Sequence, residues 1–148
     1  MKPIRNILLA TDFSAASRPA FRRALDLAKA NSAALWITHV AVPPVPISPN
    51  GYVLPRVYDE MDAAIRADAS KHLRRLLVLA QKAGVRGRTL LLRGAPSEAL
   101  ARAARGRRAD LMVLGTHGRT GVARFLVGSV ASRVVATAPC PVLTVRAA

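Results

Sequence analysis

Short apolar runs alternate along the chain with longer segments in which apolar residues recur every three or four positions. Short continuous runs bounded by turn residues are typical of buried strands, and the longer pattern is typical of amphipathic helices. The pattern predicts strands at residues 4–10, 34–40, 89–92, 111–114 and 142–145. It predicts helices at about 19–30, 57–83, 96–106 and 130–136, with Ser14 or Ser17 available to cap the first.

The strict alternation of strands and helices indicates the fold class. Continuous apolar strands joined by helices form a parallel sheet that helices cover on both faces. We therefore expect a doubly wound, Rossmann-like α/β fold with five parallel strands. A chain of 148 residues is the size of one ordinary domain, so residues 1–148 are expected to form a single unit. Five prolines between residues 42 and 55 predict a long loop.

Composition and cysteine content bear on where the protein works. Hydrophobic residues make up 51% of the chain, enough for a sizeable core, but no run approaches the ~20 apolar residues of a membrane span. The N-terminus lacks the long apolar stretch of a signal peptide. The single cysteine, Cys140, cannot form an intramolecular disulfide, and the three histidines have no zinc-site spacing. We expect a cytoplasmic protein without a membrane partner or structural metal.

The net charge of +15 is unusually high, and 19 of the 23 basic residues are arginines. Such a field attracts anions, and it has two interpretations: a nucleic-acid partner, or an arginine-rich bias spread over solvated helix faces. The arginines are dispersed from Arg5 to Arg146, which favours the second interpretation. Any binding of nucleic acid is expected to be weak and indifferent to base sequence, because dispersed arginines contact phosphates without reading bases.

In an open parallel sheet, ligands bind beyond the carboxyl ends of the strands, where the strand order reverses. The loop after the fourth predicted strand is the most unusual of these ends, because glycines recur from Gly115 to Gly128 before a helix begins. Glycines let the backbone approach a phosphate closely, and the free N–H groups of a helix start hold negative charge. Ser129 adds a hydroxyl donor, or is simply the cap of that helix.

The spacing Gly115-x-x-Gly118, nine residues, Gly128-Ser129 resembles the ATP-binding signature of the universal stress protein family. Other segments resemble the family in the same order: residues 7–14, His39-Val40 at the end of the second strand, and residues 140–143. The likeness covers nearly the whole chain. It implies a fold like that of the adenine nucleotide alpha hydrolases, and a bound adenine nucleotide.

The resemblance also implies a role for each residue of the site. Asp12 resembles the acidic residue near adenine and ribose, and Val40 resembles the residue that contacts adenine. Asp is also a common turn residue before a helix, but the position of Asp12 at the switch point favours a ligand role, which includes a water-mediated contact to Mg²⁺. Val130 stands where many members carry a hydroxyl residue. The remaining expected positions are a ribose and phosphate cradle of Gly115, His117, Gly118, Gly128, Ser129 and Val130, with walls of Ala10, Thr11 and Leu114.

The function implied by the resemblance is an ATP-binding regulatory module of the stress response, assembled as a homodimer through strand 142–145. An alternative is a slow ATPase or phosphotransferase, in which Arg119 or Arg124 reaches the phosphates. The chain lacks the Gly-x-x-x-x-Gly-Lys-Ser/Thr loop of many such enzymes, and no catalytic residue is assigned. A further alternative is a nonspecific polyanion binder. His117 is expected to be a solvated donor, His39 a partly packed residue and His72 a solvated one.

Overall fold

Five parallel strands form one sheet in the order β3-β2-β1-β4-β5. The computed structural model describes residues 2–45, 51, 54–116 and 128–147. The strands are β1 (Asn6–Ala10), β2 (Ala34–Ala41), β3 (Arg86–Arg93), β4 (Leu111–Gly115) and β5 (Val142–Val145). The helices are the short 3-10 turn η1 (Ala15–Ser17), α1 (Arg18–Asn31), α2 (Pro55–Lys82), α3 (Pro96–Gly106) and α4 (Ser129–Thr137). The expected doubly wound α/β fold is confirmed.

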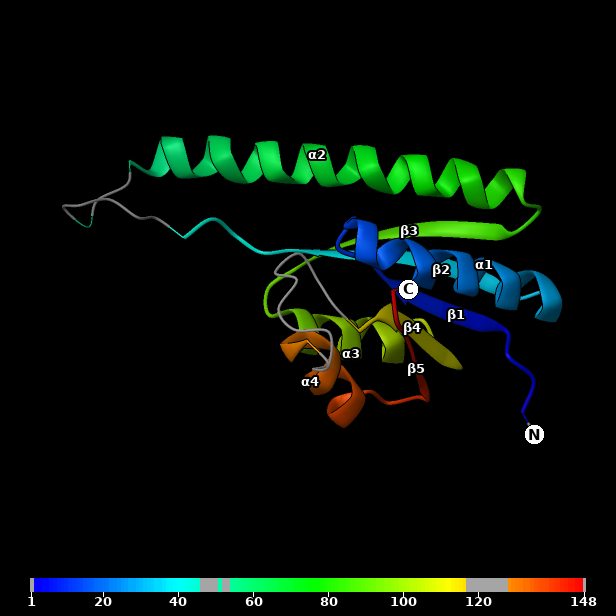
Figure 1. Cartoon of the computed structure of the whole chain (residues 1–148). Coiled ribbons are helices and arrows are strands. Elements are labelled where there is room, and N and C mark those ends of the chain that lie inside the picture. Colours follow the sequence, from blue (N-terminus) through cyan, green and yellow to red (C-terminus); the bar gives the residue numbers. More distant parts are fainter. Residues whose placement is uncertain (1, 46–50, 52–53, 117–127, 148) are drawn as a thin grey trace.

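The helices cover both faces of the sheet, α1 and α2 on one and α3 and α4 on the other (Figure 1). Successive side chains of a strand point to opposite faces of the sheet. Because helices cover both faces, consecutive residues of one strand can all be buried. On β1, Ile7 and Leu9 pack in the layer under α1 and α2, while Leu8 packs in the layer under α3 and α4. All three are fully buried, which explains why the central strands read as unbroken apolar runs.

The third strand and the second helix differ from the sequence prediction. β3 has eight residues because it pairs with β2 along its full length, from Ala34↔Arg86 to Ala41↔Arg93. Its first residues are polar because β3 is an edge strand. For this reason the apolar pattern predicted only residues 89–92. The N-terminal part of α2 reaches beyond the strands (Figure 1). Met61, which fits the apolar stripe, is therefore 49% exposed, whereas Leu73 is buried.

Asp110 connects the segment before β1 to β4. Its Oδ2 accepts hydrogen bonds from the backbone N–H groups of Arg5 (2.9 Å) and Asn6 (3.0 Å). Its Oδ1 lies 2.9 Å from Lys2 Nζ. The bond to Lys2, followed by the backbone bonds, lowers the pKa of the Asp110 carboxyl. This carboxylate therefore fixes the start of β1 beside β4.

No helix in the described part of the chain is long and apolar enough to cross a lipid bilayer. The longest, α2, has 28 residues, and charged side chains recur along it.

Candidate functional site

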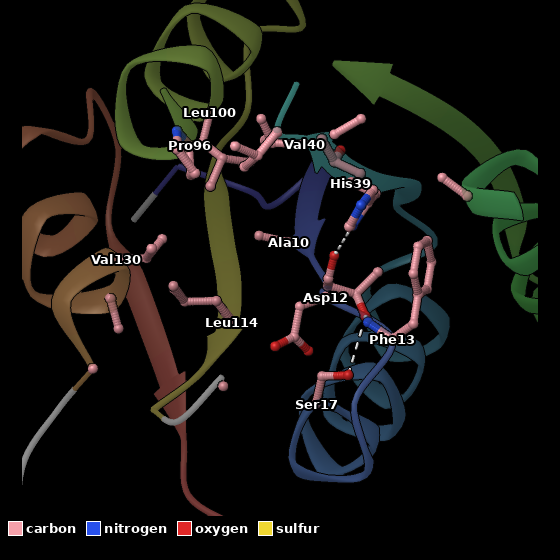
Figure 2. Close-up of a pocket in the computed structure, with 18 of the residues that line it drawn as sticks. Ala10, Asp12, Phe13, Ser17, His39, Val40, Pro96, Leu100, Leu114 and Val130 are labelled. Carbon is pink, nitrogen blue, oxygen red and sulfur yellow. Dashed lines mark hydrogen bonds between the residues drawn. The ribbon is translucent and has the colours of Figure 1, made fainter. Parts of the chain in front are cut away.

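The carboxyl ends of β1, β2 and β4 open into a pocket of about 870 Å³ (Figure 2). It lies where the strand order reverses, because the chain passes from β1 to β2 on one side and places β4 on the other. Helices α2, α3 and α4 complete its walls. The volume lies within the range of about 300–1,000 Å³ typical of small-molecule sites.

Most residues that the sequence nominated for a ligand site line this pocket. They are Ala10, Thr11, Asp12, Val40, Leu114, Gly115, Gly128, Ser129 and Val130. His117 and Gly118 lie outside the described residues, as do Arg119 and Arg124. The structure therefore brings together three strand ends and the start of α4, which are far apart in the sequence.

Thr11 fixes the turn that follows β1. Its backbone N–H donates to Thr38 O (2.9 Å), which continues the pairing between β1 and β2 by one residue. Its buried side-chain oxygen accepts from the backbone N–H of Phe13 (3.1 Å) and lies 3.1 Å from Ser17 Oγ. Ser17 occupies the cap position of α1 but makes no side-chain cap bond, because its hydroxyl donates to Ser14 O (2.8 Å).

Asp12 is both a turn residue and a pocket residue. Its Oδ1 accepts from the backbone N–H of Ser14 (3.0 Å) and from Ser14 Oγ (2.6 Å). These bonds hold the side chain in one orientation, and Figure 2 shows the carboxylate directed into the pocket. The site therefore has a fixed negative group at the end of β1.

An aromatic stack supports the same turn from the side of α2. The Phe13 ring lies between His39 of β2, at a centroid distance of 4.4 Å, and His72 of α2, at 4.9 Å. His39 Nδ1 is 2.8 Å from Thr11 O, so this nitrogen donates to the carbonyl. Phe13 has a φ of 64°, which is rare for a bulky residue and requires surrounding contacts to hold it. The expectation that His72 is solvated is correct only in part: 39% of its side chain is exposed, but its ring packs on Phe13 and its Nε2 lies 3.5 Å from Asp68 Oδ2.

Strand β2 continues beyond the end of β1, which leaves backbone groups facing the pocket. The last pair between the two strands is Ala10↔Thr38, and Thr38 O accepts the Thr11 N–H. The N–H and C=O of one residue in a parallel strand face the same neighbour, and alternate residues face the same side. Val40 therefore turns both groups toward the side where β1 has already ended. Among the described residues, neither group has a hydrogen-bond partner on that side.

The start of α4 forms the opposite wall. Gly128 is the cap residue, so Ser129 is the first residue of the helix and not its cap. The Gly128 N–H donates to Thr116 O (2.7 Å), and a Cβ at position 128 would lie only 3.3 Å from that oxygen. Val130 is 40% exposed and faces the pocket (Figure 2). The positive end of the α4 dipole thus lies at the pocket's edge.

Several pocket residues were not assigned to the site from the sequence. Pro96 and Leu100 of α3 form one wall, and Ile65, Asp68 and Ala69 of α2 form another. Ile65 and Ala69 recur at helical spacing within the predicted helix 57–83, which indicates an apolar face but not what that face borders. Spacing within one helix contains no signal that distinguishes a packed neighbour from a pocket.

Two observations bear on the chemistry available to the described residues. Within the described ranges, no group of three or more His, Cys, Asp or Glu side chains could hold a metal ion. Cys140 packs against the layer under α3 and α4, where burial raises the pKa of its thiol and keeps it protonated. The described part of the pocket offers apolar surface, main-chain donors and acceptors, the Asp12 carboxylate and one helix N-terminus.

Comparison with known proteins assigns the family. The model described as "Universal stress protein family" matches residues 3–146. A universal stress protein of Thermus aquaticus is 39% identical over 143 residues, covering 96% of this chain and 98% of that protein. The structure of universal stress protein UspA from Lactobacillus plantarum has a TM-score of 0.86 at 29% identity, covering 99% of this chain and 100% of the other.

A third match has a ligand. A universal stress protein solved in complex with cAMP has a TM-score of 0.72 at 27% identity, covering 99% of this chain and 100% of that one. Sequence and fold agree over almost the full length. This chain belongs to the universal stress protein family.

Proposed function

We propose that the pocket binds an adenine nucleotide, ATP in the cell, and that the protein is a single-domain, cytoplasmic regulatory module that responds to this nucleotide. The observation that carries the proposal is the exposed backbone of Val40 beside the apolar walls at the strand switch point. A related protein solved with cAMP supports an adenine ligand. A single cysteine suits the reducing cytoplasm, because the chain needs no disulfide.

Val40 distinguishes adenine from other bases by hydrogen-bond pattern. Adenine offers an acceptor at N1 and an amino donor at N6, which match a backbone N–H and C=O on one residue. Leu114, Ala10 and Leu100 supply apolar surface for the faces of the base. Guanine presents the reverse pattern, O6 as acceptor and N1–H as donor, so both backbone groups would be mispaired.

In this proposal, the phosphates of the nucleotide bind at the start of α4. Backbone N–H groups there and the helix dipole favour negative charge, and the small Gly128 permits close approach. Ser129 adds a hydroxyl, whereas Val130 contributes only its backbone N–H. Mg²⁺ usually binds nucleotides through their phosphates, water and one or two carboxylates, and Asp12 fits the role of a water-mediated partner.

The adenine proposal predicts strong discrimination against guanine. Each mispaired buried polar group costs about 1–3 kcal/mol, so two should make GTP at least about 30-fold weaker than ATP. Isothermal titration with ATP, GTP and CTP at physiological salt measures this ratio. Equal affinity for ATP and GTP would show that the +15 charge attracts any polyanion and that Val40 does not read the base.

A native ligand provides the complementary measurement. Protein purified without added nucleotide is denatured, and the released small molecules are identified by mass spectrometry. Adenine nucleotide supports the proposal. Hydrolysis of ATP at about one per second or faster, a rate typical of kinases, would contradict the proposed binding module and indicate an enzyme.

We also propose a homodimer formed through β5. This strand is the edge of the sheet beyond β4, and its residues Val142–Val145 are only half-buried. An exposed apolar edge strand tends to pair with another chain, and two copies can pair antiparallel across a twofold axis. Sedimentation at micromolar concentration should report about twice 15.7 kDa. A monomer with and without ATP would contradict this assembly.

A further inference from the structure

A second depression, about 390 Å³ in volume, lies between β3 and α3 and is bordered by arginines. We call it the arginine groove. Leu90 and Leu92 of β3 line its strand side, and Ala99 and Ala103 line its helix side. Arg93, Arg102, Gly106 and Arg107 complete its border. The groove uses a different part of α3 from the nucleotide pocket, which contacts Pro96 and Leu100.

Two arginines at the same side of the sheet are held over one aromatic ring. Trp36 of β2 is the direct register partner of Arg88 on β3. The Arg88 guanidinium carbon lies 5.4 Å from the centroid of the Trp36 ring, and that of Arg107 lies 4.6 Å from it. Both arginines are exposed. The attraction between each cation and the ring restricts the guanidinium groups while their N–H groups remain accessible to solvent.

The groove carries excess positive charge. Arg93 pairs with the buried Asp62 (2.9 Å), and Arg102 lies 4.0 Å from Glu98, at the limit of an ion pair. Arg107 on the border, and Arg88, which lies outside the groove but shares the Trp36 ring with Arg107, form no ion pair with a carboxylate among the described residues. The arginines that are dispersed along the sequence therefore meet in space, with too few acidic groups to neutralise them.

We propose that the arginine groove binds single-stranded nucleic acid without base specificity. Guanidinium groups recognise phosphate oxygens by paired hydrogen bonds. A guanidinium plane over tryptophan also offers a flat surface on which an unpaired base stacks. The apolar floor of Leu90 and Leu92 accommodates base or sugar, which a duplex would keep inside its stack.

The stacking surface and the charge together favour nucleic acid over an acidic peptide. Carboxylates would use the arginine charges but would leave the flat guanidinium faces unused. Arg88, Leu90 and Leu92 alternate along one face of β3, so this face spans four residues at about 3.3 Å each, roughly 13 Å, which suits only a few nucleotides. The surface is thus expected to contact only a short stretch of single-stranded nucleic acid, with an affinity that falls as the salt concentration rises.

The test uses a dye-labelled oligodeoxythymidine of about twelve nucleotides and fluorescence anisotropy over a range of salt concentrations. Phosphate contacts from Arg88, Arg102 and Arg107 predict a slope of log K against log salt of about −2.1, at about −0.7 for each contact with a single strand. Trp36, the only tryptophan in the chain, reports independently on the site. Its fluorescence should change when unlabelled oligonucleotide binds beside it.

The decisive variant is Arg88→Gln with Arg107→Gln. Loss of two contacts should reduce the slope to about −0.7, and this change corresponds to about 25-fold weaker binding at 0.1 M salt relative to a 1 M reference. Arg22→Gln with Arg23→Gln is the matched control, because both residues are exposed on α1, on the other face of the sheet, and the net charge changes equally. It should retain the wild-type slope within experimental error.

Two further measurements separate stacking from charge and from the nucleotide pocket. Arg107→Lys keeps the charge but not the plane, so it should retain the slope and still weaken binding severalfold. Gly128→Val, at the nucleotide pocket, should leave oligonucleotide binding unchanged. Equal losses in the α1 control and the groove variant would overturn the proposal, as would preference for duplex DNA or polyglutamate.

Discussion

Gly128→Val should abolish the thermal stabilisation that ATP gives the wild-type protein. At a ligand concentration one hundred times Kd, binding stabilises the folded state by about 2.7 kcal/mol. For a protein of this size the melting temperature should rise by roughly 5–11 °C, at about 2–4 °C per kcal/mol. In the variant that rise should disappear. A Cβ at position 128 would already lie 3.3 Å from Thr116 O, and the valine methyl groups would extend from the wall where we propose that the phosphates bind.

Differential scanning fluorimetry with and without ATP at physiological salt measures the effect. Each variant is compared with its own ligand-free form, because valine is a poor cap residue and lowers the baseline stability of α4. Gly106→Val is the control, since a Cβ at Gly106 meets no atom within 4 Å and this glycine lies outside the pocket. A folded Gly128→Val protein that keeps the full shift would place the nucleotide elsewhere.

Leu9→Ala should lower stability by about 2–5 kcal/mol, the range for truncating a buried leucine. Leu9 is fully buried in the middle of the central strand β1, in the layer under α1 and α2. Its register partners are Ile37 of β2 and Val113 of β4. Because these strands hold the neighbouring side chains in place, we expect little collapse into the cavity that the substitution leaves. The melting temperature should fall by roughly 4–20 °C, at about 2–4 °C per kcal/mol.

Leu79→Ala provides the matched control for the core substitution. Leu79 lies on α2 with 51% of its surface exposed, so the same truncation should change stability by only about 0.5 kcal/mol. Urea unfolding of both variants gives the two free energies directly. Equal destabilisation by the two substitutions would contradict the burial of Leu9 and the exposure of Leu79.

The order and type of the elements could be predicted from local pattern alone. Unbroken apolar runs such as Ile7–Leu9 require burial on both sides, and helical spacing between them requires covering helices. Together they exclude an antiparallel sheet and determine the doubly wound fold. The glycine spacing before Ser129 and the acidic end of β1 also lie within short segments, so they could be found without a structure.

The exact extent of β3 could not be predicted, because the polarity of an edge strand matches that of a loop. Arg86 and Arg88 belong to β3 only because Ala34 and Trp36 of β2 pair with them. Similarly, nothing local distinguishes the buried half of α2 from the half that reaches beyond the sheet.

The functional surfaces were decided by tertiary structure. Val40 presents its backbone to the pocket because β2 extends beyond the end of β1. This difference cannot be deduced from the sequence of either strand alone. Phe13 lies between His39 and His72 because α2 crosses the end of β2. Arg88 and Arg107 share one Trp36 ring because parallel register and the return from α3 to β4 place them together. Local pattern specifies which side of an element is buried, but only long-range pairing decides which residues meet.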